Sequence, residues 1–177
     1  MHDIHVADFV AAAAILVAVA TYVLTARREK ALHRAELVHA YSSEFSRDRE
    51  LVDLFTDIDY ERFEFEADQS RWLGQDPEKQ LIRMLDLFNS IGHNWHRKIV
   101  SLDDIHGTTL GYAILRAFND PNVNRYLEFV DQHDADHLGT GAAFEYFRLI
   151  AVDLEKKSVD MRRTKVERLS ASNLRSA

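Results

Sequence analysis

Nine histidines give this chain its clearest capacity for chemistry. Four of them form two pairs at ligand-like spacings, His93 with His96 and His133 with His137. The second pair stands in the acidic stretch HDADH, and imidazoles and carboxylates gathered inside a helical bundle can bind a divalent metal. Pairs at these spacings also arise by chance on helices, and polar residues at a helix end are usually solvated. We therefore keep a metal site as an alternative and expect no cofactor.

Two further pairs combine Arg with His. Arg28 and His33 are separated by four residues, as are Arg34 and His39, and this spacing resembles the Arg and His pair of helical ribonucleases of the HEPN type. Those nucleases present the pair from a bundle helix near the C-terminus, whereas both pairs here adjoin an apolar segment, where basic residues set membrane topology. The sequence favours a protein without enzymatic activity, and a metal-dependent or HEPN-like hydrolase stays open as an alternative.

Other catalytic patterns are missing from the sequence. It contains no Gly-rich phosphate loop, nucleophile elbow or HExxH motif. The absence of Cys excludes disulfides, zinc ribbons, iron–sulfur ligation and a thiol nucleophile. Asp86, Asn89 and His93 line one flank of an expected helix, where they form either a small polar network or solvated surface. We assign no catalytic residue.

An uncharged segment near the N-terminus predicts a membrane anchor. Residues 9–26 read FVAAAAILVAVATYVLTA, and as a helix they span about 27 Å, close to the thickness of a bilayer core. A buried helix of a water-soluble protein is the alternative, but such a helix normally carries a polar stripe, and only Thr21 and Thr25 interrupt this segment. We expect one transmembrane helix and a short extracytoplasmic N-terminus over residues 1–8.

The charges that flank this segment predict its orientation. The first eight residues carry Asp3 and Asp8 and no Lys or Arg, so they lack the basic region of a cleaved signal peptide. The basic residues that follow the segment are Arg27, Arg28, Lys30 and Arg34. The positive-inside rule places that flank in the cytosol. We expect a bacterial inner-membrane protein whose N-terminus lies outside and whose C-terminal domain is cytosolic.

The distribution of charge limits the partners. The formal net charge is −7, and residues 42–155 are strongly acidic, whereas residues 27–41 and 156–177 are net basic. An acidic body repels phosphate backbones and argues against nucleic acid as a partner. The expected partners are the lipid bilayer, through the anchor and the basic tail, and either a second copy of the chain or another protein.

The remaining sequence predicts an all-α domain. The chain is 46% hydrophobic, with ten Phe, six Tyr and two Trp, which suffices for a core. We expect the transmembrane helix to continue into a juxtamembrane rod over residues 27–45. A compact bundle of about five helices over residues 46–157 and a basic flexible tail over residues 158–177 follow.

Local signals place the helices of the bundle. Ser46 is a candidate cap for the first of them, and the alternating stretch 58–66 has no second strand to pair with, so we expect an irregular connector pinned by its aromatics. Pro77 to about Arg97 forms the central helix. A capping box at Ser101 and Asp104 opens one helix that reaches Phe118.

Two further helices complete the expected bundle. The stretch Asn119-Asp120-Pro121 opens the first of them. The second begins after the break Gly139-Thr140-Gly141 and ends near Lys157.

The order of these segments resembles known bacterial proteins. The anchor, the basic rod, the connector IDYERFEF, the helix EKQLIRMLDLFNSIG, and the segments NVNRYLEFVDQH and AAFEYFRLI resemble bacterial families of unknown function with a membrane-anchored helical domain. The likeness covers roughly residues 5–155 and implies membrane location and a helical fold. The layout is more distantly similar to the membrane accessory protein of RNA-targeting CRISPR systems, a resemblance that implies a pore-forming oligomer.

These observations favour a membrane-anchored helical interaction or scaffold module that self-associates. An oligomeric membrane effector or pore in phage defence or stress response is the first alternative, and the hydrolase described above is the second.

Overall fold

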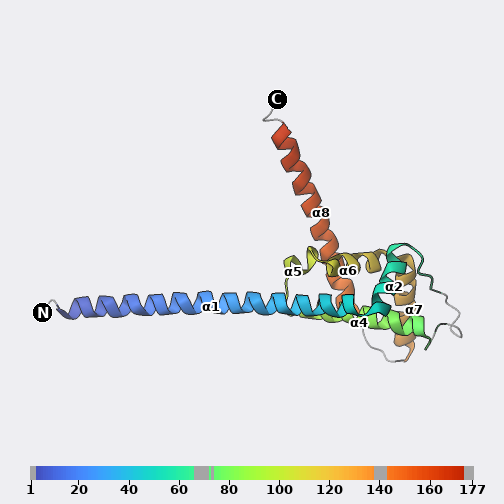
Figure 1. The fold of residues 1–177 in the computed structure, drawn as a ribbon, viewed down its shortest axis with the longest axis horizontal. Helices are drawn as coiled ribbons and strands as arrows, with labels where there is room; N and C mark the ends of the chain where they lie inside the picture. The colour runs from blue at the N-terminus through green and yellow to red at the C-terminus, as the bar shows by residue number, and fades with distance from the viewer. Residues whose placement is uncertain (1–2, 66–71, 73, 138–142, 174–177) are drawn as a thin grey trace. The chain divides into compact units, whose positions relative to one another are not determined.

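The computed structural model describes residues 3–65, 72, 74–137 and 143–173, with side chains described for residues 9–65, 72, 74–132 and 143–163. Every element in this part of the chain is an α-helix, which confirms the predicted all-α class. The chain divides into two units, Met1–Leu37 and Val38–Ala177. The helices, shown in Figure 1, are α1 (Asp3–Arg47), α2 (Arg49–Asp59), α4 (Asp76–His96), α5 (Leu102–His106), α6 (Thr109–Asn119), α7 (Pro121–His137) and α8 (Glu145–Asn173).

Helix α4 is the central helix of the second unit, as predicted. It begins with Asp76 and Pro77. Proline fits the first turn of a helix, because an N–H group there has no carbonyl partner within the helix. Its buried apolar residues recur at helical spacing and form one broad face that meets other elements, whereas the opposite face is exposed. The buried apolar residues are Leu81, Met84, Leu85, Leu87, Phe88 and Ile91.

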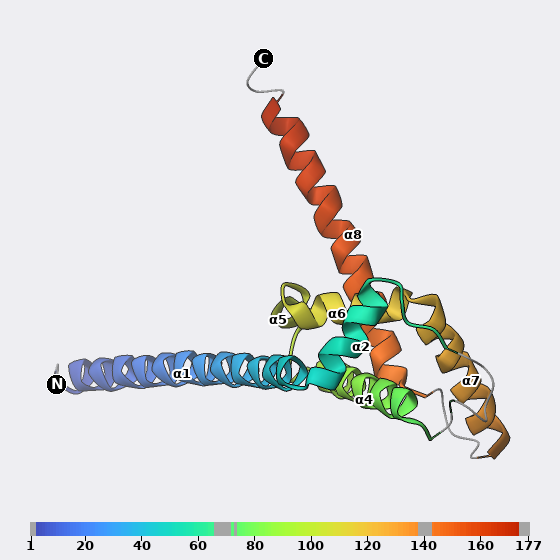
Figure 2. The same cartoon turned by 45° about the vertical axis from the view of Figure 1, so that its right-hand side comes forward.

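The most extensive contact in the domain joins α4 to α8, and the first turns of α8 lie against α4 in both Figure 1 and Figure 2. Gly92 allows this approach, because a Cβ placed there would overlap the main-chain carbonyl of Tyr146. Beside this point the rings of Phe88 and Phe147 stack with centroids 5.8 Å apart. Phe147, Ile150 and Leu154 are fully buried, so α8 closes the core.

The helix expected from Ser101 to Phe118 is wrong in one respect, because the structure divides it into α5 and α6. The capping box at its start is confirmed: Ser101 accepts from the Asp104 N–H, and Asp104 accepts from the Ser101 N–H. The division follows from a second cap at Thr108, whose hydroxyl accepts a hydrogen bond from the Gly111 N–H at 3.3 Å. In the described part of the chain six helices therefore follow α1, and the short α5 accounts for the excess over the expected five.

The cap of α2 also differs from the prediction. Asp48, not Ser46, is the N-cap residue, and its carboxylate accepts from the N–H groups of Glu50 and Leu51 at 3.1 and 3.3 Å. Both residue types can cap a helix, but α1 remains helical through Arg47 and thereby includes Ser46.

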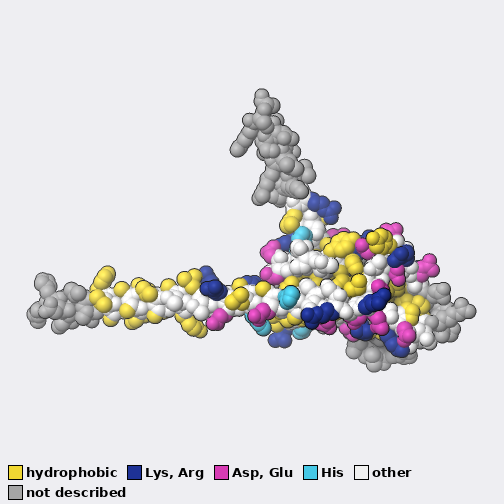
Figure 3. Space-filling view, in the orientation of Figure 1, with side chains coloured by type: hydrophobic (Ala, Val, Ile, Leu, Met, Phe, Trp, Pro, Cys, Tyr) yellow, Lys and Arg dark blue, Asp and Glu magenta, His cyan; other side chains and the backbone are white. Residues whose placement is uncertain are grey.

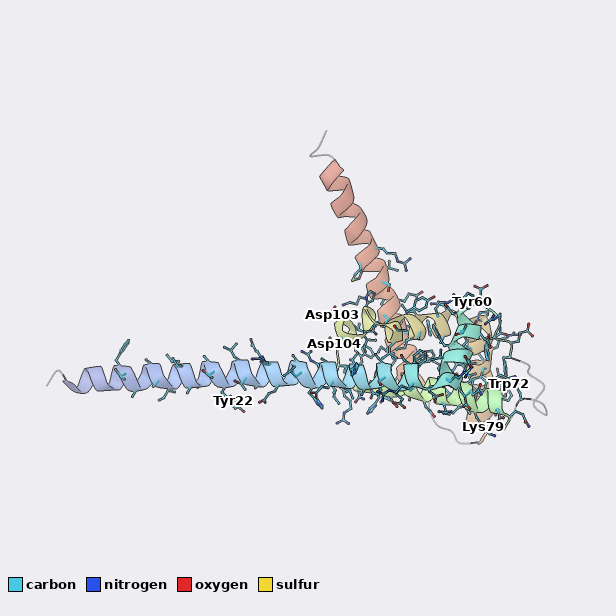
Figure 4. The ribbon with its side chains drawn as sticks, viewed as in Figure 1. Tyr22, Tyr60, Trp72, Lys79, Asp103 and Asp104 are labelled. Carbon is cyan, nitrogen blue, oxygen red and sulfur yellow. The ribbon has the colours of Figure 1, made fainter. Side chains whose placement is uncertain are left out.

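The connector after α2 is irregular over residues 62–65, as predicted. Phe63 and Phe65 are buried, and both pack edge-on against Trp72, which Figure 4 labels. The main chain of the connector finds its partners in the side chain of Asn122, which donates to the Phe63 carbonyl at 2.7 Å and accepts from the Phe65 N–H at 3.4 Å. One amide thus replaces the missing strand partner.

Helix α8 is longer than predicted. The expected end near Lys157 is wrong, because the helix continues to Asn173. Residues 158–173 contain no Gly or Pro and include three Arg, one Lys and one Glu, which are good helix formers. The basic composition of residues 158–173 is therefore compatible with a helix.

The close approach at Gly92 generates a stability prediction. Gly92→Ala should lower the free energy of unfolding by about 1–3 kcal/mol, because the added methyl group must push main chain from main chain. Thermal unfolding followed by circular dichroism measures the loss. Gly107→Ala is the control: a Cβ there meets no atom within 4 Å, and the change should stay within about 0.5 kcal/mol. Equal stability of the two variants would contradict the packing at Gly92.

Candidate functional site

The apolar segment at the start of α1 offers an uncovered surface. Among the described residues it is the one segment long and apolar enough to span a membrane, and its window of mean hydropathy 2.3 has none of its residues buried. Figure 3 shows hydrophobic side chains along this segment up to the first Lys and Arg residues. Tyr22, labelled in Figure 4, projects from the same helix. The segment can therefore meet an apolar medium on every side.

One hydroxyl group of this segment has its partner inside the helix. The hydroxyl of Thr21 donates to the Val17 carbonyl at 2.8 Å. Such a bond satisfies the hydroxyl without water, so the threonine can lie in lipid at little cost. The predicted flanking residues Arg27, Arg28, Lys30 and Arg34 continue on the same helix.

The two Arg and His pairs lie on α1. Arg28 and His33, like Arg34 and His39, stand five residues apart on one continuous helix. At 3.6 residues per turn they are about 140° apart around the axis. The structure adds no further contact between the members of either pair, and the HEPN-like alternative stays a prediction.

The structure places His93 and His96 against an aromatic ring. The imidazole centroids lie 4.8 Å and 5.3 Å from the ring of Tyr146 on α8. Among the described residues no group of three or more His, Cys, Asp or Glu is arranged to hold a metal. The side chains of His133 and His137 lie outside the described residues, and a metal site that combines both pairs stays an alternative.

The flank of Asp86, Asn89 and His93 serves different contacts at each position. The side-chain oxygen of Asn89 accepts from the Phe147 N–H at 3.2 Å and so satisfies a donor in the first turn of α8. Asp86 lines a groove of about 270 Å³, where partial burial raises the pKa of its carboxyl group. The groove also contains Tyr41, Glu44 and Arg83.

Arg83 ties the start of α2 to α4. Its guanidinium donates to Glu50 at 2.9 Å and to the capping carboxylate of Asp48. The positive charge in the groove is thus already bound to two carboxylates, which leaves the groove a negative surface rather than an anion site.

Arg116 performs the same task at the other end of α2. Its guanidinium contacts the Asp59 carboxylate at 2.9 Å and donates to the Asp59 carbonyl at 2.6 Å. The Tyr112 hydroxyl donates to the same carboxylate, and this hydrogen bond raises the pKa of Tyr112. The cluster satisfies carbonyls that the end of a helix leaves without partners. The hydrogen bonds of Arg116 therefore connect the end of α2 to α6, and we call this cluster the Arg116 joint.

One pair of reactive residue types was missed by the sequence analysis. His106 Nε2 lies 3.0 Å from the Ser158 hydroxyl, and the neighbouring Lys157 pairs with Asp103 of α5, labelled in Figure 4. Ser158 lies mid-helix, where main-chain N–H groups are consumed by the helix and cannot stabilise an oxyanion. The pair therefore joins α5 to α8. The predicted helix end at Lys157 hid this contact.

Comparison with protein-family models, with curated proteins and with solved structures finds no match to this chain. The assignment of function therefore rests on the physical properties of the surfaces described above.

The joint at Arg116 generates a testable contrast. Arg116→Gln should destabilise the domain by about 1–3 kcal/mol, because it removes bonds to a carboxylate and two main-chain carbonyls. Denaturant unfolding measures the change.

Arg62→Gln is the matched control. Arg62 and Asp57 are 2.8 Å apart, but their side chains are 60% and 51% exposed, against 31% and 27% for Arg116 and Asp59. Exposed pairs contribute about 0–1 kcal/mol. Similar losses in the two variants would show that the half-buried bonds of Arg116 stabilise the domain no more than an exposed ion pair does.

Proposed function

We propose that this protein is a single-pass membrane protein whose helical domain is an interaction or scaffold module that self-associates or docks a protein partner at the bacterial inner membrane. The observation that carries the proposal is the apolar segment of α1, which has none of its residues buried. Exposed hydrophobic surface of this size marks a place where a protein meets a membrane or another protein.

The energetics of the segment favour lipid. Each Leu, Ile, Phe or Val near the centre of a spanning helix contributes about −0.3 to −0.6 kcal/mol to insertion. A continuous helix satisfies all of its main-chain groups internally, which is the strict requirement for crossing hydrocarbon. The bond from Thr21 to Val17 extends the same condition to a side chain.

The orientation follows from the flanking charges. Arg27, Arg28, Lys30 and Arg34 stand on the C-terminal side of the segment, and the N-terminal side lacks basic residues. The positive-inside rule then places the helical domain in the cytosol. The proposed inner-membrane location also rests on the resemblance to membrane-anchored helical families of bacteria.

The polar clusters of the domain have structural roles. Arg83, Arg116 and Asn122 each join one element to another through hydrogen bonds to carboxylates or main-chain groups. A catalytic group needs a free position beside it for a reacting atom. In the described residues these clusters are committed to holding helices together.

The alternative of a pore is weakened by the chemistry of the segment. A water-filled channel requires polar or charged side chains toward its lumen. The segment offers Thr21 and Thr25, and the Thr21 hydroxyl already has its partner in the helix. A membrane effector in phage defence or stress response, related in layout to the CRISPR accessory protein, therefore ranks second.

Membrane insertion is tested by a charge placed at two matched leucines. Leu16→Arg should move the protein from the carbonate-resistant membrane fraction toward the soluble fraction, because an arginine at the helix centre costs about 2.5–3.5 kcal/mol. Leu32→Arg makes the same change beyond the segment and should remain membrane-bound. Wild-type protein recovered as a soluble monomer would overturn the proposal.

Orientation is tested by reporters fused to the C-terminus. A fluorescent protein that folds in the cytosol should be active, and a phosphatase that needs the periplasm should be inactive. The reverse pattern would place the domain outside and remove the cytosolic assignment.

A further inference from the structure

Helix α8 presents two opposite faces. The face with Phe147, Ile150 and Leu154 is buried against the bundle. The opposite face exposes Leu149, Val152 and Val159 by 41%, 36% and 56% of their surfaces. Exposed aliphatic residues that follow a single line along a helix form a surface for another helix.

The spacing of this line is that of a coiled coil. We define the α8 seam as Glu145, Leu149, Val152, Lys156, Val159 and Arg163. Its steps alternate between four and three residues, which is the heptad repeat that keeps one seam of a helix facing a partner helix. In the sequence, Val166 occupies the next position of the repeat.

We propose that the α8 seam pairs with the α8 seam of a second copy of this chain, and that the two helices run antiparallel. The inference rests on the self-association proposed above and names its surface. In this pairing Leu149 of each copy packs against Val159 of the other, and Val152 packs against the aliphatic part of Lys156. Each layer joins the two different seam positions of the heptad, as antiparallel coiled coils require.

The charges of the seam select this direction. A parallel pair in register would bring Lys156 next to Lys156 and Arg163 next to Arg163 of the other copy, which is repulsive. The antiparallel pair brings Glu145 opposite Arg163 at both ends. Arg163 already interacts within its own chain, and the pairing adds a contact to Glu145 of the other copy.

The predicted contact between Glu145 and Arg163 cannot form within one chain. The two residues lie about 27 Å apart along the same helix, at 1.5 Å per residue. Any energetic coupling between them therefore reports on contact between copies.

Membrane anchoring compensates for the small contact area of the seam. A seam with three exposed aliphatic residues per copy covers little area, and in free solution it would bind weakly. Anchoring both copies in one bilayer raises their effective concentration and makes a weak contact sufficient. Two anchors can insert in the same direction while the α8 helices run antiparallel if the twofold axis follows the membrane normal.

Cysteine cross-linking of the full-length chain in membranes tests the direction, because the natural sequence has no Cys. Leu149→Cys and Val159→Cys are produced separately and together, with different tags. Mild oxidation should give disulfide dimers when the two variants are co-expressed and only background dimer when either is expressed alone. Both substituted positions are exposed, so the variants should retain the wild-type circular dichroism spectrum.

Two results would overturn the inference. Dimers formed by each single variant alone would indicate a parallel pair, and no dimer in any combination would indicate that the seam is not an interface. Lysine-reactive cross-linking of the same membranes reports self-association through any surface. Lysine cross-links without cysteine dimers would reject the seam and leave the proposed function standing, whereas the absence of both would reject self-association too.

Charge exchange tests the contact at the ends of the seam. In the co-expressed cysteine pair, Glu145→Lys should lower the dimer yield several-fold, as should Arg163→Glu. The double variant should recover most of the wild-type yield, because opposite charges again face each other. If the dimer yield of the double variant is as low as the two single losses together predict, Glu145 and Arg163 do not contact each other between copies.

Discussion

The approach of α8 to α4 at Gly92 governs the architecture of the helical domain. With a hydrogen atom in place of a side chain, Gly92 lets the main chain of Tyr146 come close enough for the rings of Phe88 and Phe147 to stack. Asn89 then reaches the Phe147 N–H. The remaining helices complete this pair: α6 and α5 contact α8, and α2 contacts α4. A single missing methyl group therefore fixes the distance on which the rest of the core is built.

Helices with a strong apolar periodicity could be predicted from the sequence. Helix boundaries could not, where two neighbouring residues can both cap a helix. Helix α4 was predictable because Pro77 marks its start and its apolar residues recur at helical spacing. The start of α2 was not, because Ser46 and Asp48 are both good caps and the length of α1 decides between them. The break between α5 and α6 depends on the Thr108 cap, a local contact that competes with continuous helix.

Contacts between distant segments explain the remaining differences at the candidate sites. The spacing of His93 and His96 is visible in the sequence, but Tyr146, the ring that both contact, comes from another helix. Nothing near Phe63 or Phe65 indicates that Asn122 supplies their hydrogen bonds. The apolar segment of α1 was readable because its composition alone makes it suitable for a bilayer, whatever packs elsewhere. Surfaces defined by one helix can thus be read from sequence, whereas those built by two cannot.

The order of α4 and α8 along the chain has a consequence for biosynthesis. The core residues Phe147, Ile150 and Leu154 are translated after the whole of α4. Until they leave the ribosome, the face of α4 that carries Phe88 and Ile91 lacks the cover that α8 provides, although Phe45 can already contact Phe88. The nascent domain therefore exposes apolar surface of α4 while α8 is still being synthesised. Such a chain depends on a holding chaperone, or on rapid completion of synthesis, to avoid aggregation before its core can close.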